Sequence, residues 1–134
     1  MHREIATADA PPALGPYSQA VAAGSLVFCS GTAGIDPSTG EVREGIRAQT
    51  EQALVNVAAI LRAAGASMDD VVKTTVMYKN VDDFATINET YATHFSEPYP
   101  ARSAPSNVHL PKGLLLSIDV IAVLPTHGSS SGEL

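Results

Sequence analysis

The chain has 134 residues, of which 45% are hydrophobic and 16% charged, and its formal net charge is −6. This length suits one domain with a core of its own, and the composition is that of a globular protein. The eight Lys and Arg residues are scattered, which argues against nucleic acid or an anionic membrane as a partner. No apolar run has the length of a membrane span, and we see no secretion signal. Because Cys29 is the only cysteine, an internal disulfide is excluded. These features favour the cytoplasm.

The first third of the chain predicts an extended segment followed by strands. Residues 5–16 are rich in Ala and Pro and are expected to lie extended across a surface. Residues 18–23 predict a short strand, and residues 25–31 contain a continuous apolar run typical of a central strand. Asp-Pro-Ser-Thr-Gly at 36–40 is a strong turn signal, after which residues 41–43 are expected to return as a brief edge strand.

The middle of the chain changes to helical spacing. Apolar residues recur every three or four positions over 46–64 and Gly65 follows as a helix stop, which predicts a helix over this range. Residues 71–79 alternate and predict a strand, with Val72, Thr74, Val76 and Tyr78 on one face. A second helix is expected from Asp82 to Glu97, with Asn88 at the border of an inward stripe. That stripe consists of Phe84, Ile87, Tyr91 and Phe95.

The last strand is predicted over residues 114–123 and is apolar on both faces. Leu116, Ile118, Val120 and Ala122 share one face; Leu115, Ile121 and Val123 share the other, which Ser117 and Asp119 interrupt. A carboxylate there is costly unless it has a donor, a cation or a ligand. Residues 104–110 are expected to pair with this strand as a hairpin, through a turn at 111–113. That pairing would place Arg102 opposite the stretch around Asp119, although the face of each side chain stays open.

Strands interrupted by two helices predict an α+β domain over residues 1–125, with one mixed sheet that carries both helices on one face. Residues 126–134 are expected to form a disordered tail. The helices cover one face only, and no predicted element is left to cover the other apolar face. The sequence therefore predicts a homo-oligomer in which sheets pack face to face.

Several short motifs lie in order along the chain between residues 5 and 123. They are Gly15-Pro16-Tyr17-Ser18-Gln19-Ala20-Val21, Phe28-Cys29-Ser30-Gly31, Asp36-Pro37-Ser38-Thr39-Gly40-Glu41-Val42, Asn88-Glu89-Thr90-Tyr91, Pro100-Ala101-Arg102-Ser103, Leu110-Pro111-Lys112-Gly113 and Ile118-Asp119-Val120-Ile121-Ala122-Val123. Together they resemble the RidA (YjgF-type) family of imine and enamine deaminases. The resemblance implies a chorismate-mutase-like fold, a homotrimer whose sheets form a central barrel, and ligand clefts between subunits. It also implies a 2-iminobutanoate/2-iminopropanoate deaminase type of hydrolase, which converts 2-enamine and 2-imine acids to 2-keto acids and ammonia.

This resemblance assigns roles to two charged residues. Arg102 matches the carboxylate-binding arginine of the family, whose planar fork can hold a substrate carboxylate through two hydrogen bonds. The alternative is a structural salt bridge, for example to Asp119. Asp119 stands where the family's deaminases carry a glutamate that helps to position water, so its carboxylate is withdrawn by about 1 Å. The alternative is a buried Asp held by backbone donors.

Four further residues match positions that line the family's cleft: Tyr17, Ser30, Gly31 and Asn88. Ser30 and the Gly31 amide are expected to donate to a carboxylate or a developing charge, and Asn88 to bond the substrate amine or water. Each has a plain alternative, since Tyr17 can pack, Ser30 and Gly31 can close a strand, and Asn88 can cap local backbone.

No cofactor and no metal are expected. The imine is already activated, so only water has to be positioned, and neither His94 nor His109 has a second ligand at metal-binding spacing. Ala104 replaces a cysteine common in the family, and Cys29 is interpreted as a small buried hydrophobe. The expected partner is a small imine or keto acid. The alternatives are a non-enzymatic binder of 2-keto acids in the same cleft and a nucleic-acid role, which the acidic charge disfavours.

Overall fold

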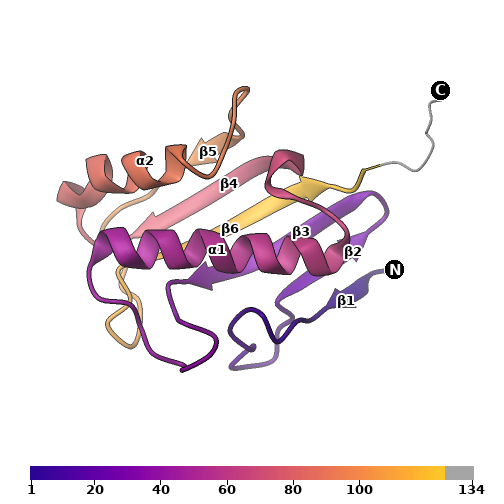
Figure 1. The fold of residues 1–134 in the computed structure, drawn as a ribbon, viewed down its shortest axis with the longest axis horizontal. Coiled ribbons are helices and arrows are strands. Elements are labelled where there is room, and N and C mark those ends of the chain that lie inside the picture. The colour runs from indigo at the N-terminus through magenta and orange to yellow at the C-terminus, as the bar shows by residue number, and fades with distance from the viewer. Residues whose placement is uncertain (126–134) are drawn as a thin grey trace.

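A mixed sheet of six strands, with two helices on one of its faces, makes up the fold (Figure 1). The computed structural model describes residues 1–125. In chain order the strands and helices are β1 Arg3–Ile5, β2 Ala20–Ala23, β3 Leu26–Ala33, α1 Ile46–Ala64, β4 Val71–Tyr78, α2 Phe84–Ala92, β5 Ala101–Ser103 and β6 Leu116–Val123, with short 3₁₀ turns at Met68–Asp70 and Val81–Asp83. The strand order is β1-β2-β3-β6-β4-β5. The predicted α+β class, with both helices on one face, is confirmed. Within residues 1–125, neither helix is long and apolar enough to cross a membrane.

Strand β6 forms the centre of the sheet, because it pairs with both β3 and β4 in antiparallel fashion. Its predicted core face is confirmed: Leu116, Ile118, Val120 and Ala122 are all buried on the side that the helices cover. Each fully buried Leu or Ile side chain contributes about 1.5–3 kcal/mol. This row of side chains therefore anchors the helix layer to the sheet.

Helix α1 has the predicted bounds. Its buried face, which includes Leu54, Val57 and Leu61, packs on the sheet. The helix ends at Gly65, whose φ of 90° lies in the left-handed region, and the Gly65 and Ala66 N–H groups donate to the last carbonyls. The helix stop read from the sequence is therefore the C-cap itself.

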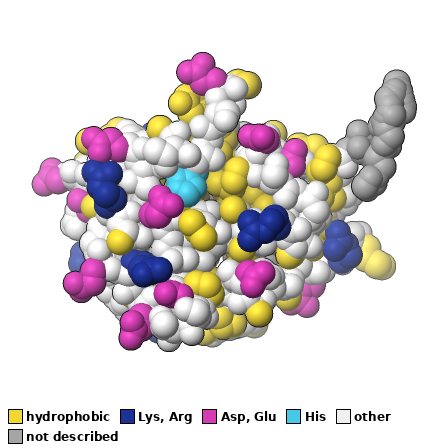
Figure 2. Space-filling model, in the orientation of Figure 1, with side chains coloured by type: hydrophobic (Ala, Val, Ile, Leu, Met, Phe, Trp, Pro, Cys, Tyr) yellow, Lys and Arg dark blue, Asp and Glu magenta, His cyan; other side chains and the backbone are white. Residues whose placement is uncertain are grey.

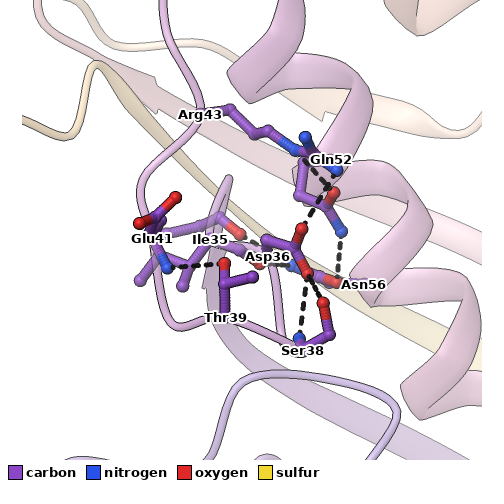
Figure 3. Close-up of polar contacts among 9 residues, drawn as sticks. Ile35, Asp36, Ser38, Thr39, Glu41, Arg43, Gln52 and Asn56 are labelled. Atoms are coloured by element: carbon purple, nitrogen blue, oxygen red, sulfur yellow. Dashed lines mark hydrogen bonds and ion pairs between the residues drawn. The ribbon is translucent and has the colours of Figure 1, made fainter.

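A chain of polar contacts ties α1 to the loop after β3 (Figure 3). Asn56, fully buried, donates from Nδ2 to the carbonyls of Ala33 and Ile35, at 3.0 and 2.9 Å. Its Oδ1 accepts from Gln52 Nε2 at 2.9 Å, and Gln52 in turn accepts from Arg43 Nε. Two part-buried carbonyls at and just after the end of β3 thereby accept hydrogen bonds from the helix.

The predicted hairpin between residues 104–110 and the last strand is wrong. Strand β5 lies at the sheet edge and pairs in parallel with β4, where Arg102 is in register with Thr74. The segment that follows β5 runs past the end of β4 instead, and the Tyr78 N–H donates to the Pro105 carbonyl. Pro105 itself has no N–H for a ladder, which disfavours the predicted strand.

Four other features differ from the prediction. Helix α2 ends at Ala92, five residues before the expected stop, and the Thr93 hydroxyl donates to the Thr90 carbonyl at 2.7 Å. The expected edge strand at 41–43 is reduced to one bridge between Ile35 and Val42. A bulge after Val71 leaves Val72 48% exposed, away from the buried face of β4. Strand β1 lies at the start of the chain, ahead of the segment expected to be extended.

The sheet face opposite the helices has no cover within the described part of the chain. Phe28 and Val123 are 38% and 37% exposed there, and Ile121 is half-buried. This agrees with the apolar second face read from the sequence. The homo-oligomer inferred from it stays a prediction, and the predicted disordered tail lies outside the described residues.

Candidate active site

Arg102 is held from one side by helix α2. Because Arg102 is in register with Thr74, whose side chain is buried under the helices, both side chains lie on the helix face of the sheet. Arg102 Nη1 donates to Asn88 Oδ1 at 2.8 Å. The guanidinium carbon lies 4.9 Å from the ring centroid of Tyr91 and 5.6 Å from that of Phe84. Tyr91 is itself fixed by a 2.8 Å hydrogen bond with Thr74.

These supports orient the guanidinium without neutralising it. An amide oxygen and two aromatic faces attract a cation, but none carries a full negative charge. Among residues 1–125, no carboxylate lies within ion-pair distance of Arg102. A half-buried guanidinium in this state has the charge and the free donors to bind an external carboxylate.

Asp119 lies on the opposite face of the sheet. Its direct partner in β4 is Thr75, which follows Thr74 and so points to the other side. On its other flank, Cys29 pairs with Val120 and Thr32 with Ile118. A bulge of two residues, Ser30 and Gly31, therefore stands opposite Asp119.

The surroundings of Asp119 shift the pKa of its carboxyl group in opposite directions. Burial raises the pKa of the Asp119 carboxyl above its usual value, while a hydrogen bond from Thr75 and the nearby Lys73 ammonium oppose this rise. Lys73 Nζ donates to Thr75 Oγ1 at 3.1 Å. The carboxylate thus has a hydroxyl donor and a cation beside it, which are the partners that the sequence led us to require.

Arg102 and Asp119 do not meet within one chain. The alternative in which Arg102 forms a salt bridge to Asp119 of the same chain is wrong, because the sheet separates the two side chains. The predicted juxtaposition depended on the hairpin, which the parallel pairing of β5 replaces.

Tyr17, Ser30 and Gly31 line a single cavity of about 440 Å³. Ser30 Oγ donates to the Ser18 carbonyl at 2.6 Å, so its hydroxyl proton is already used. A Cβ at position 31 would stand 2.6 Å from Ser117 Oγ, so a larger residue there requires the Ser117 side chain to move. Tyr17 is 50% exposed and its hydroxyl accepts from the Leu14 N–H. Asn88 lies apart from these residues, beside Arg102.

Gln19 organises the loop that forms one wall of this cavity. Its Nε2 donates to the carbonyls of Thr7, Ala10 and Pro11, and its Oε1 accepts from the Thr7 N–H at 2.7 Å. A buried glutamine thus supplies the partners that an irregular segment lacks. Sequence reasoning did not single out this role.

Sequence reasoning also missed the supports of the two charged residues. Phe84, Asn88 and Tyr91 follow the i, i+4, i+7 spacing of one helix face. Their side chains therefore point in the same direction, and all three contact Arg102. Phe84 was expected in the core, yet it is 41% exposed beside Arg102. Thr75 and Lys73 became partners of Asp119 only through strand register.

The remaining candidates take no part in this arrangement. Cys29 is buried as predicted, and burial together with Asp119 raises the pKa of its thiol to about 12. His94, two residues after the end of α2, forms a 2.8 Å contact with Glu51 of α1, and His109 is exposed. Within the described residues, no group of three or more His, Cys, Asp or Glu side chains could hold a metal ion.

Comparison with known proteins identifies the family. The model described as Endoribonuclease L-PSP matches residues 7–124. The 2-iminobutanoate/2-iminopropanoate deaminase of Salmonella typhimurium is 48% identical over 126 residues, which cover 92% of this chain and 98% of that protein. RidA from the Antarctic bacterium Psychrobacter is 48% identical in its crystal structure, with a TM-score of 0.89 over 91% of this chain and 99% of that one. The chain belongs to the RidA family.

Membership of the RidA family confirms the resemblance drawn from the motifs, and the RidA-like fold agrees with it. The crystal structure of E. coli TdcF with bound serine is also similar, at 43% identity and a TM-score of 0.87 over 92% of this chain and 99% of that one.

Proposed function

We propose that this protein is a hydrolytic deaminase of small 2-enamine and 2-imine acids, which releases 2-keto acids and ammonia. In this proposal it acts in the cytoplasm, without a cofactor, as a homotrimer whose sheets form a central barrel. The names of its relatives support the type of reaction. No nucleic acid or membrane is required.

The observation that carries this proposal is the unpaired charge of Arg102. Three groups of α2 fix the guanidinium, and no carboxylate of residues 1–125 neutralises it. A 2-imino acid brings the missing carboxylate. Because Asp119 is on the other sheet face, we place the substrate between Arg102 of one protomer and the Ser30–Gly31–Asp119 region of a neighbour.

The proposed reaction needs only positioning and one proton relay. The enamine tautomerises to the imine, whose C2 is electrophilic. Water held by Asp119 attacks C2, and the new C–O bond forms as the C=N electron pair takes up a proton at nitrogen. The carbinolamine then expels ammonia, and loss of its hydroxyl proton leaves the 2-keto acid. Tyr17, Ser30, Gly31 and Asn88 complete the cleft in this proposal.

The test is the decay of 2-iminopropanoate generated in situ by an amino-acid oxidase. We expect wild type to accelerate the loss of the imine, and Arg102→Ala to reduce this acceleration by about a hundredfold or more, since the acid loses its orienting contact. Arg47→Ala is the matched control, because Arg47 is exposed and paired with Glu89. Equal rates for wild type and Arg102→Ala would contradict the proposal.

The second candidate is a binder of small 2-keto acids, which the short reach of Asp119 favours. One methylene fewer withdraws the carboxylate by about 1 Å, enough to slow a reaction that depends on geometry. Binding of pyruvate by wild type, without faster loss of imine, would support this candidate. Higher turnover by Asp119→Glu would show that reach is what limits the native site.

The charge distribution gives no support to a role on RNA, despite the endoribonuclease description of the family model. The net charge is −6, and Lys and Arg side chains lie between acidic ones on the face that Figure 2 shows. Nucleic-acid binding requires a concentration of positive charge. Cleavage of RNA that survives Arg102→Ala would revive this alternative.

A further inference from the structure

We infer that His94 is a positioning residue for the Arg102 site. Its contact with Glu51 holds helix α2 in place, and the protonation of His94 makes the affinity of the site for a carboxylate depend on pH. The inference rests on the proposed function, because it takes Arg102 as the group that binds the acid. It assigns a role to a histidine that the proposed reaction does not use.

The orientation of Arg102 depends on helix α2. Arg102 belongs to β5, a strand of three residues at the edge of the sheet that pairs only with β4. The three groups that hold its guanidinium all come from α2: the Asn88 amide oxygen and the rings of Tyr91 and Phe84. A shift of α2 therefore moves every support of the guanidinium at once.

Helix α2 is short, so its position depends on what it packs against. It has nine residues, of which Ile87, Thr90 and Tyr91 are buried, and a helix of this length is not stable by itself in water. The hydrogen bond between Tyr91 and Thr74 ties it to β4. It also packs along α1 on the same face of the sheet (Figure 1). The contacts with α1 therefore contribute directly to where α2 lies.

Two polar contacts connect α1 with α2 and the turn that follows it. Arg47 Nη2 lies 2.8 Å from Glu89 Oε1, and both side chains are largely exposed, so this pair contributes little. His94 Nε2 lies 2.8 Å from Glu51 Oε1, and the His94 side chain is only 16% exposed, so this contact is less screened by water. The His94 N–H also donates to the Tyr91 carbonyl at 3.0 Å. His94 thus links α1 to the turn of α2 that carries Tyr91.

The contact between His94 and Glu51 changes in strength with pH. Imidazole is the side-chain group that ordinarily changes its charge between pH 5 and 8. When protonated, His94 forms an ion pair with the Glu51 carboxylate; when neutral, it donates a single uncharged hydrogen bond, so the contact weakens as the pH rises. Carboxylates and guanidinium groups keep their charge over this range. The other charged groups on the elements around His94 are of these two kinds: Glu44 before α1, Arg47 on α1, Glu89 on α2 and Glu97 after it.

The first experiment measures the dissociation constant of pyruvate by calorimetry at about pH 6 and about pH 8, which span the titration of an ordinary imidazole. The proteins are wild type, His94→Gln and Glu51→Gln, each checked for folding by circular dichroism. We expect the ratio of the value at the higher pH to that at the lower pH to be about fivefold larger in wild type than in either variant, because a charged hydrogen bond exceeds a neutral one by about that factor. All three proteins contain Asp119, so its own titration cancels in the comparison. Equal ratios would overturn the inference.

Two control variants separate this contact from general effects of charge. His2→Gln makes the same substitution at an exposed histidine just before β1, at the sheet edge opposite β5, and it should keep the wild-type ratio. Arg47→Gln removes the other contact between the helices, whose members do not titrate in this range, and it should keep the ratio as well. If His2→Gln lowered the ratio as much as His94→Gln does, the pH dependence would not come from the contact with Glu51, and the inference would be wrong.

Hydrogen exchange separates this inference from the proposed function. At the lower pH, the α2 amides of His94→Gln should exchange about fivefold faster than those of wild type, while the α1 amides keep their rates. If α2 responds in this way but pyruvate does not bind and no imine is hydrolysed, the proposed function fails and the positioning of α2 by His94 stands. If Arg102-dependent hydrolysis of 2-iminopropanoate is observed and neither the pyruvate ratio nor the exchange of α2 responds to His94→Gln, the inference fails and the function stands.

Discussion

Burial and the neighbouring polar groups shift the pKa of the Asp119 carboxyl in opposite directions, and the hydroxyl group of Thr75 is the main neighbour that opposes burial. Burial raises the pKa of Asp119, and the hydrogen bond from Thr75 is the first influence that opposes it. Lys73 donates to the same hydroxyl oxygen. The Thr75 proton is thereby left free to face Asp119, and the Lys73 charge is brought near it. In the proposed function, Thr75 is therefore a positioning residue for the Asp119 carboxylate.

Replacement of Thr75 by Val should shift the pH dependence of turnover. Without the hydroxyl donor, the pKa of Asp119 rises further, and the ionised form that holds water is lost at a higher pH than in wild type. The acidic limb of the kcat/KM profile should therefore move to higher pH, with roughly tenfold lower activity at its acidic end. Thr75→Ser, which keeps the donor, should restore the native profile. Identical profiles for Thr75→Val and wild type would exclude this role.

At the scale of elements, the position of α1 over the sheet depends on a polar residue as well as on its apolar face. Asn56 is the fully buried member of the contacts in Figure 3, and it satisfies the carbonyls at the end of β3. Ile35, one of its partners, also lines the cavity. The same side chain therefore fixes the helix and one wall of the proposed site.

Asn56→Ala should destabilise the protein by about 2–4 kcal/mol, because two carbonyls and the Gln52 amide lose a buried partner. Urea unfolding at fixed protein concentration measures this change. Val55→Ala, next to it on the exposed side of α1, should cost less than about 1 kcal/mol. Similar losses for both variants would mean that the polar contacts add no stability.

Periodicity and turn chemistry were sufficient to predict some elements and not others. Helix α1 and the buried face of β6 follow from spacing alone, because each has a long, regular apolar pattern. Strand β5 does not, since three residues carry no periodicity and its parallel partner β4 is remote in sequence. The motifs identified Arg102 and Asp119 as the charged pair, but their separation by the sheet depends on register. Register is a property of pairing between distant segments, which local patterns do not encode.

At the scale of the whole molecule, the separation of Arg102 and Asp119 by the sheet determines how protomers have to assemble if both residues belong to one site. The helices cover the face that holds Arg102, while the face that holds Asp119 is open and partly apolar. A site that uses both residues has to join different surfaces of two protomers, as in a heterologous interface that closes into a ring. Such a ring is consistent with the proposed trimer.

Mixed assemblies of two inactive variants should therefore recover activity. Arg102→Ala keeps Asp119, and Asp119→Ala keeps Arg102, so a cleft formed between one protomer of each kind contains both native residues. Random mixing in a ring should restore roughly a quarter of wild-type activity, because half of the protomers supply each residue. The variants are denatured together, refolded and assayed with 2-iminopropanoate, with each variant refolded alone as the control. If each site lay within a single protomer, the mixture would be as inactive as its components, and the shared cleft would be excluded.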